Sequence, residues 1–155
     1  MNSQKNVMVL HGVYFSKLEK KIEKQEVHEY TQENKYDKIP TFYSKETWPL
    51  KTNIKCWECD RIPKGSPYFA ATKYLKDPTG NFCSAPCVES FIETKMDRLH
   101  RWEMQQQLFE LYYQRHGIRP KHIRPSPNKI NRIEYGGSMN DDDYEEQIKK
   151  CIQFQ

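Results

Sequence analysis

The longest regular alternation of apolar and polar positions lies between residues 88 and 116. Apolar side chains recur there mostly every three or four residues, the spacing that gathers them on one face of an α-helix. No glycine or proline interrupts the stretch before Gly117, and glycine is a common residue just after a helix end. The pattern predicts one long helix, and the polar run 103–107 leaves room for a break. The apolar positions are Val88, Phe91, Ile92, Met96, Leu99, Trp102, Leu108, Phe109 and Tyr112.

A short β-prone run precedes this helix. Residues 67–74 are rich in aromatic and small apolar side chains and predict one strand of a hairpin. Pro78 and Gly80 are turn residues, and residues 80–82 supply the second strand. A hairpin followed by a long helix predicts an α+β fold.

The flanks of this central part are less regular. Residues 7–15 fit a strand with a turn at Gly12 and a flexible arm equally well. Residues 16–34 fit a helix with one thin apolar stripe or a solvated segment. Residues 118–133 hold three prolines and read as an extended linker, and an acidic tail follows them. The predicted parts are therefore an N-terminal arm (1–50), the central part (51–117), and a basic linker with an acidic tail (118–155).

Composition limits the size of the core. Of the 155 residues, 36% are hydrophobic and 30% charged, whereas average globular chains have about 45–50% apolar residues. Aromatic residues make up 13% of the chain, which is too many for a fully disordered protein. A modest core with polar arms fits these values. The net charge of +4 is a weak indication of an anionic partner.

The chain has five cysteines, and an odd number fits poorly with a closed disulfide framework. Four form two close pairs, while Cys151 stands alone. This usage is typical of a reducing compartment, where paired cysteines more often bind metal than oxidise. No signal peptide and no run of about 20 apolar residues is visible. We therefore expect a soluble, intracellular protein with no membrane contact.

The paired cysteines predict a metal site. Two residues separate Cys56 from Cys59, so that one tight turn can direct both sulfurs at one ion, and Cys83 and Cys87 stand at a helix start, where the dipole favours thiolate. Four thiolates close a tetrahedral shell on one Zn²⁺ without an open position for water, which indicates a structural site and no enzyme. Buried unliganded cysteines, a redox pair at 56–59 and an iron–sulfur cluster are the alternatives. No histidine pairs with the cysteines, and no catalytic set is visible.

A resemblance becomes specific at these residues. The segment Gly80-Asn81-Phe82-Cys83-Ser84-Ala85-Pro86-Cys87 resembles the Phe-Cys-Ser-x-x-Cys signature of FCS/MYM-type zinc knuckles, and Cys56-Trp57-x-Cys59 matches their first pair. Together with the chain length, this arrangement most resembles the poxvirus-type viral late transcription factor 2 family of large DNA viruses. The resemblance covers residues 54–95.

The resemblance implies a small treble-clef-like knuckle with extended arms at both ends. It also implies a zinc-binding late transcription factor in post-replicative gene expression. Such a factor would work with the viral transcription machinery, on DNA or RNA, in the host cytoplasm at viral factories; the virion and the nucleus stay open as locations. The second hypothesis is a non-enzymatic interaction protein, either a virion component or an antagonist of host signalling, that uses the knuckle as a binding platform.

A basic stretch follows the predicted helix. It contains no acidic residue between 114 and 133, and its cations could follow a phosphate backbone and release counterions. A solvated linker and a docking segment for an acidic protein surface are the alternatives. The candidate nucleic-acid-binding residues are Arg115, Arg119, Lys121, Arg124, Lys129 and Arg132.

Aromatic and apolar residues also suggest contacts. Those around the cysteines favour core packing, with base stacking as the alternative. The first half of the predicted helix, to Trp102, is expected to dock on the knuckle. Its second half carries more apolar surface than a small knuckle can cover, so helix 88–116 could form a dimer or partner contact. The residues concerned are Leu108, Phe109, Leu111, Tyr112 and Tyr113.

Overall fold

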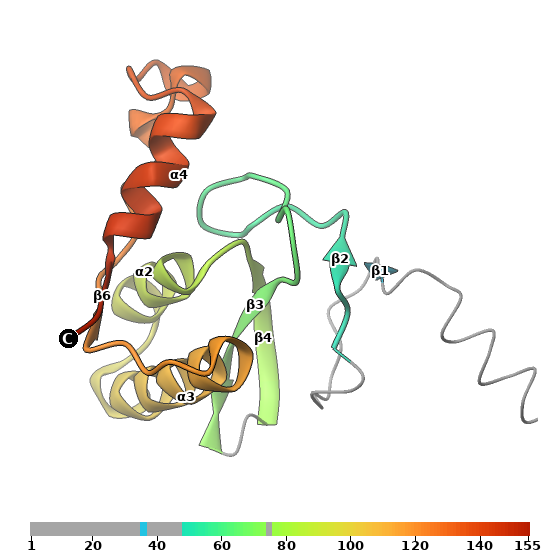
Figure 1. The fold of residues 1–155 in the computed structure, drawn as a ribbon, viewed down its shortest axis with the longest axis vertical. Coiled ribbons are helices and arrows are strands. Elements are labelled where there is room, and N and C mark those ends of the chain that lie inside the picture. Colours follow the sequence, from blue (N-terminus) through green and yellow to red (C-terminus); the bar gives the residue numbers. More distant parts are fainter. Residues whose placement is uncertain (1–34, 37–47, 74–75) are drawn as a thin grey trace, which may run out of the picture. The chain divides into compact units, whose positions relative to one another are not determined.

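The computed structural model describes residues 35–36, 48–73 and 76–155 (Figure 1). They belong to one unit, Lys35–Gln155. The strand and helix considered for residues 7–34 lie outside these ranges. The described part combines small two-stranded sheets with helices, which confirms the predicted α+β class.

The predicted hairpin is present. Strand β3 (Tyr68–Thr72) pairs antiparallel with β4 (Lys76–Phe82), and the register shifts twice along the pair. Gly80 in β4 has a φ of +80°, and a Cβ atom there would lie 2.4 Å from the Phe82 ring. A residue without a side chain is therefore required where the strand approaches Cys83.

Two helices replace the single helix predicted over 88–116. Helix α2 (Ala85–Lys95) ends at Met96, and α3 (Arg98–His116) begins directly afterwards. Asp97 causes the break because its side chain accepts hydrogen bonds from the N–H groups of Leu99 and His100, as an N-cap does. The polar run 103–107, which left room for a break, lies inside α3. The predicted helix end is confirmed, since Gly117 (φ +69°) caps α3.

The break also changes which apolar residues are buried. Ile92 on α2 is fully buried, but Leu99 and Trp102 on α3 are 82% and 68% exposed, so the prediction that they dock on the knuckle is wrong. The second half of α3 packs on β3 instead of remaining open. The surface from which a dimer was predicted is therefore largely covered by the chain itself. The covered residues include Leu108, Leu111 and Tyr112.

The C-terminal part is more ordered than a linker and a tail. Strand β5 (His122–Ile123) pairs antiparallel with β6 (Ile152–Gln153) near the chain end. Between them lie two 3₁₀ turns, η2 (Lys129–Asn131) and η3 (Ile133–Tyr135), and helix α4 (Asp141–Lys150). Prolines cannot donate a backbone hydrogen bond, but their rings still offer apolar surface for packing. The tertiary contacts of residues 118–133 therefore could not be predicted from composition. Tyr144 of α4 is fully buried.

Upstream of the cysteines, β1 (Lys35–Tyr36) pairs in parallel with β2 (Lys51–Thr52). Trp48 lies shortly before β2 in the sequence and packs on Phe69, with ring centroids 4.2 Å apart. Its Nε1 donates to the carbonyl oxygen of Pro67 over 2.9 Å. Among the residues that the structure describes, no helix has the length and apolar character needed to cross a membrane.

Candidate metal centre

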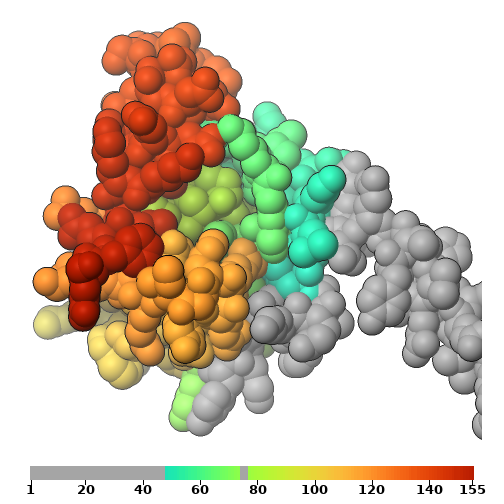
Figure 2. All heavy atoms as spheres, in the orientation of Figure 1, coloured from blue at the N-terminus to red at the C-terminus, as the bar shows by residue number. Residues whose placement is uncertain are grey.

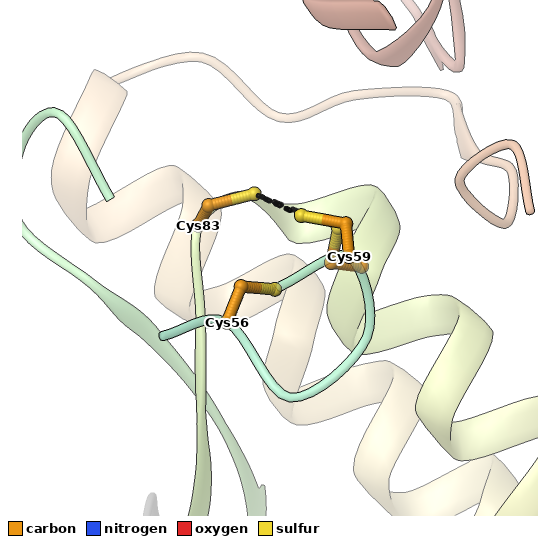
Figure 3. A group of neighbouring side chains, drawn as sticks. Cys56, Cys59 and Cys83 are labelled. Atoms are coloured by element: carbon orange, nitrogen blue, oxygen red, sulfur yellow. Dashed lines mark hydrogen bonds between the residues drawn. The ribbon is translucent and has the colours of Figure 1, made fainter. Parts of the chain in front are cut away.

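The four predicted ligands converge from three segments of the chain. Cys56 and Cys59 lie in the turn after β2, Cys83 follows β4, and Cys87 lies in the first turn of α2. All four sulfur atoms lie within 4.8 Å of one another, with 3.4 Å between Cys59 and Cys83 and 3.6 Å between Cys83 and Cys87. Figure 3 shows the side chains of Cys56, Cys59 and Cys83 gathered in one place. Sulfurs around a tetrahedral Zn²⁺ lie about 3.8 Å apart, given Zn–S bonds of about 2.3 Å. The cluster could therefore hold one metal ion.

The first pair is shaped by a tight turn. The backbone amide of Asp60 donates to the carbonyl oxygen of Cys56 over 3.0 Å. The backbone amide of Cys56 donates to the carbonyl oxygen of Arg61 over 2.8 Å. Asp60 has a φ of +60°, a left-handed conformation that aspartate tolerates better than most residues. This turn brings the two sulfurs of Cys56 and Cys59 to the same side.

Asn81 fastens this turn to the hairpin. Its buried side-chain amide donates to the carbonyl oxygens of Ile54 and Lys55 over 2.8 and 3.3 Å, and its backbone carbonyl oxygen accepts from the backbone amide of Trp57. Asn81 lies within the knuckle signature, but its role could not be predicted from the sequence. Its position two residues before Cys83 was the available signal.

Burial and ionisation fit a cation at this position. Cys56, Cys59 and Cys87 are fully buried, and Cys83 is partly exposed. Hydrogen bonds, first from Cys59 and then from Cys83 and Cys87, hold the pKa of Cys56 far below its usual value. Hydrogen bonding to Cys56 conversely raises the pKa of Cys83 and Cys87. Without a cation, the cluster therefore favours only partial ionisation of its thiols. A soft divalent ion such as Zn²⁺ would stabilise all four as thiolates.

Two buried arginines stand beside the cluster. Arg61 and Arg132 are 9% and 4% exposed. Arg132 donates from Nη1 to the carbonyl oxygen of Cys59 over 2.5 Å. Burial alone would lower the pKa of Arg61, but Asp141 and then the cysteines raise it. Four thiolates and one Zn²⁺ would carry a net charge of −2, so two nearby guanidinium groups would stabilise that charge.

Helix α4 holds these arginines in place. Asp141 pairs with Arg61 over 2.9 Å and with Arg132 over 3.4 Å. The Tyr144 ring lies 5.9 and 5.7 Å from the two guanidinium carbons, and its hydroxyl donates to the carbonyl oxygen of Pro127 over 2.5 Å. Burial, followed by Cys87 and Cys59, raises the pKa of Tyr144. The acidic run, predicted from the sequence to be a tail, therefore stabilises the two arginines that lie beside the cysteine cluster.

A further acidic side chain of α4 extends this network. Glu145 accepts from Arg61 over 3.1 Å and also pairs with Lys64. The Lys64 ammonium is the main reason why the pKa of Glu145 lies below its usual value. Arg61, Arg132 and Tyr144 were not recognised as site residues from the sequence, because only the tertiary fold reveals which charges are buried.

The six candidate nucleic-acid-binding residues fall into two groups. Arg115 donates to the carbonyl oxygens of Ser66 and Pro67 and lies over the Tyr68 ring. Lys129 pairs with Asp60 over 3.0 Å, and Arg132 is buried as described above. The other three are exposed, and the described part of the chain offers them no ion pair: Arg119, Lys121 and Arg124.

Comparison with known proteins gives viral relatives. The chain is 30% identical over 115 residues to the uncharacterized protein B175L of two African swine fever virus isolates, Pretoriuskop and Badajoz, and 31% identical to that of a Kenyan pig isolate. The aligned part covers 68% of this chain and 65% of each relative. No family model and no solved structure matches the chain. The chain is thus similar to viral proteins of unknown function, and it has a cysteine cluster that could bind metal.

Proposed function

We propose that this chain is a zinc-binding late transcription factor of a large DNA virus. It would act in post-replicative gene expression through contacts with nucleic acid, with RNA polymerase, or with both. The observation that carries the proposal is the convergence of Cys56, Cys59, Cys83 and Cys87 in an FCS-type arrangement at the start of α2. The similarity to viral proteins supports the viral setting.

In this proposal the zinc ion has a structural role. Four thiolates leave no coordination position for water or substrate, so the ion stabilises the fold and does no chemistry. Structural zinc can contribute on the order of 10 kcal/mol to folding. The ion joins the hairpin to α2, and the buried arginines connect it to α4.

Contact with nucleic acid is assigned to the exposed cations that follow α3. Arg119, Lys121 and Arg124 lie at the surface around β5. Phosphate contacts release counterions, so that each contact adds about 0.9 to the salt slope of duplex binding. Three contacts would therefore give a slope of about −2.7 in log K against log salt.

Fluorescence polarisation with a labelled duplex tests this assignment. Neutralising the three cations together, as Arg119→Gln, Lys121→Gln and Arg124→Gln, should remove most of the salt dependence and weaken binding. The matched control neutralises three other exposed cations, Lys55, Lys95 and Arg98, and should keep most of the slope. Chromatin capture from infected cells should recover the chain on post-replicative promoters. Absence of salt-dependent binding, together with absence from promoters and polymerase, would contradict the proposal.

A second candidate is the interaction protein, and the exposed apolar pair on α3 favours it. Leu99 and Trp102 are three residues apart on one helix and are 82% and 68% exposed. Large exposed apolar side chains that lie together often mark protein contacts. Affinity capture from infected cells with the natural chain and with a Leu99→Ser, Trp102→Ser variant separates the two candidates. A partner outside the transcription machinery that only the natural chain captures would favour the second.

A further inference from the structure

The ribbon formed by β5 and β6 brings a ring and several cations to one place. Phe154, directly after β6, is 49% exposed, and its ring centroid lies 6.3 Å from that of Tyr112 on α3. In the space-filling view, the C-terminal segment lies at the surface against α3 (Figure 2). The Phe154 ring therefore packs against Tyr112 and is about half exposed to solvent.

The end of the ribbon that carries this ring also carries a cation, Lys121. His122 pairs with Gln153 and Ile123 with Ile152, so Lys121 and Phe154 both lie next to the last pair at one end of the ribbon. The amide of Lys121 donates to the carbonyl oxygen of Gln153 over 2.7 Å, which holds the two segments of the chain together there.

More cations surround the ribbon. Arg119 and Arg124 flank β5, and Lys149 and Lys150 end α4 immediately before β6. Lys149 and Lys150 make only long ion pairs, of 3.7 and 3.9 Å, within α4. Exposed pairs of this kind contribute little and can be exchanged for an external anion. We call Arg119, Lys121, Arg124, Lys149, Lys150 and Phe154 the ribbon face.

A small cavity adjoins the ribbon face. It has a volume of about 220 Å³, and Tyr112, His116, Lys149 and Ile152 are among its lining residues. Small-molecule sites usually measure roughly 300–1,000 Å³. A cavity of this size, with the rings of Tyr112 and His116 in its lining, suits one flat ring of a larger ligand better than a whole small molecule.

We infer that the ribbon face binds single-stranded nucleic acid, with one base stacked on Phe154 and the backbone held by the surrounding cations. Stacking platforms combined with cationic grooves are typical of single-strand binding, because the base faces are free only when the strand is unpaired. The inference rests on the proposed function, since it specifies the strand state of the nucleic acid that this region contacts. An acidic protein segment would use the cations but would not require the exposed ring.

The test compares a labelled single-stranded oligothymidylate with a duplex of equal length, using the full chain loaded with zinc. The natural chain should prefer the single strand. Phe154→Ala should weaken single-strand binding at least about five-fold, in keeping with the loss of one stacked base, and leave duplex binding and the salt slope unchanged. Phe154→Trp should retain single-strand binding. Lys121→Gln with Arg124→Gln should reduce the single-strand salt slope by about 1.4.

Circular dichroism and zinc content show whether each variant is folded. Equal single-strand affinities of the natural chain and Phe154→Ala would overturn the inference. If, in addition, duplex binding still depended on Arg119, Lys121 and Arg124, the proposed function would be supported and only the single-strand site would be refuted. If neither form of nucleic acid bound and only acidic proteins did, both would fall.

Discussion

Arg132 donates a hydrogen bond to the carbonyl oxygen of Cys59, although the two residues are 73 positions apart in the chain. The bond joins the turn of the first cysteine pair to the segment that leads into α4. Arg132 also pairs with Asp141, the first residue of α4. The cysteine cluster and the C-terminal helix therefore form one connected structure, in which the helix orients the turn that carries Cys56 and Cys59.

Replacing Arg132 should weaken metal binding although Arg132 is not a ligand. Arg132→Met keeps much of the side-chain volume but removes the donor to Cys59 and the compensating charge. Loss of a residue that supports ligands typically costs 10–100-fold in metal affinity. Competition with a chromophoric chelator measures this change. The exposed Arg124→Met is the matched control and should bind zinc like the natural chain, and an Arg132→Met affinity within two-fold of the natural value would contradict the role given to Arg132.

Tyr144 should stabilise the fold chiefly through its buried ring. Tyr144→Ala removes a fully buried aromatic side chain and should lower the free energy of unfolding by about 3–5 kcal/mol. Tyr144→Phe leaves the carbonyl oxygen of Pro127 without its partner and should cost about 1 kcal/mol. Urea denaturation of zinc-loaded protein measures both. Tyr113→Ala, at a position 48% exposed, should change stability by less than about 0.5 kcal/mol; equal effects of Tyr144→Ala and Tyr113→Ala would refute the docking of α4.

The start of α3 should respond to pH through His100. Its Nδ1 lies 2.7 Å from the Asp97 carboxylate, and the hydrogen bond to Asp97 raises the pKa of His100 above the usual 6.5. The stabilisation is complete below pH 6.5 and is lost as the pH rises through the higher pKa of the folded protein. NMR titration should show the pKa of His100 falling towards 6.5 in Asp97→Asn. In the same spectra His116 should titrate below 6.5, because burial and then Arg115 lower its pKa. An unchanged His100 titration in Asp97→Asn would contradict the pairing.

Local patterns in the sequence were enough to predict the four-cysteine cluster and the hairpin. The spacing of Cys56 and Cys59 determines a turn, and Phe82-Cys83 links a strand end to a helix start, so short-range geometry brings the sulfurs close. The helix end at Gly117 was predicted on equally local grounds.

The break at Asp97 was missed because the apolar spacing continues across it. A short-range signal existed, since aspartate is a preferred N-cap, but the repeat of Met96, Leu99 and Trp102 resembled one uninterrupted stripe. The exposure of Leu99 and Trp102 follows from the change of direction between α2 and α3, which periodicity alone does not encode.

The roles of the charged residues could not be predicted for a different reason. Arg124 and Arg132 belong to the same basic stretch in the sequence, yet Arg124 is exposed and Arg132 is buried against Cys59. Their difference depends on contacts with residues far away along the chain. Composition therefore predicted a basic segment but not the division between structural and free cations.

The metal content of the purified full chain tests the central claim most directly. Elemental analysis should find one zinc ion and no iron per chain, both in the natural protein and in Cys151→Ser, whose cysteine lies outside the cluster. Cys83→Ser should lose most of the zinc, and a strong chelator should unfold the natural chain. Zinc content and folding that are unchanged in Cys83→Ser, or a folded natural chain without metal, would contradict the four-cysteine zinc site.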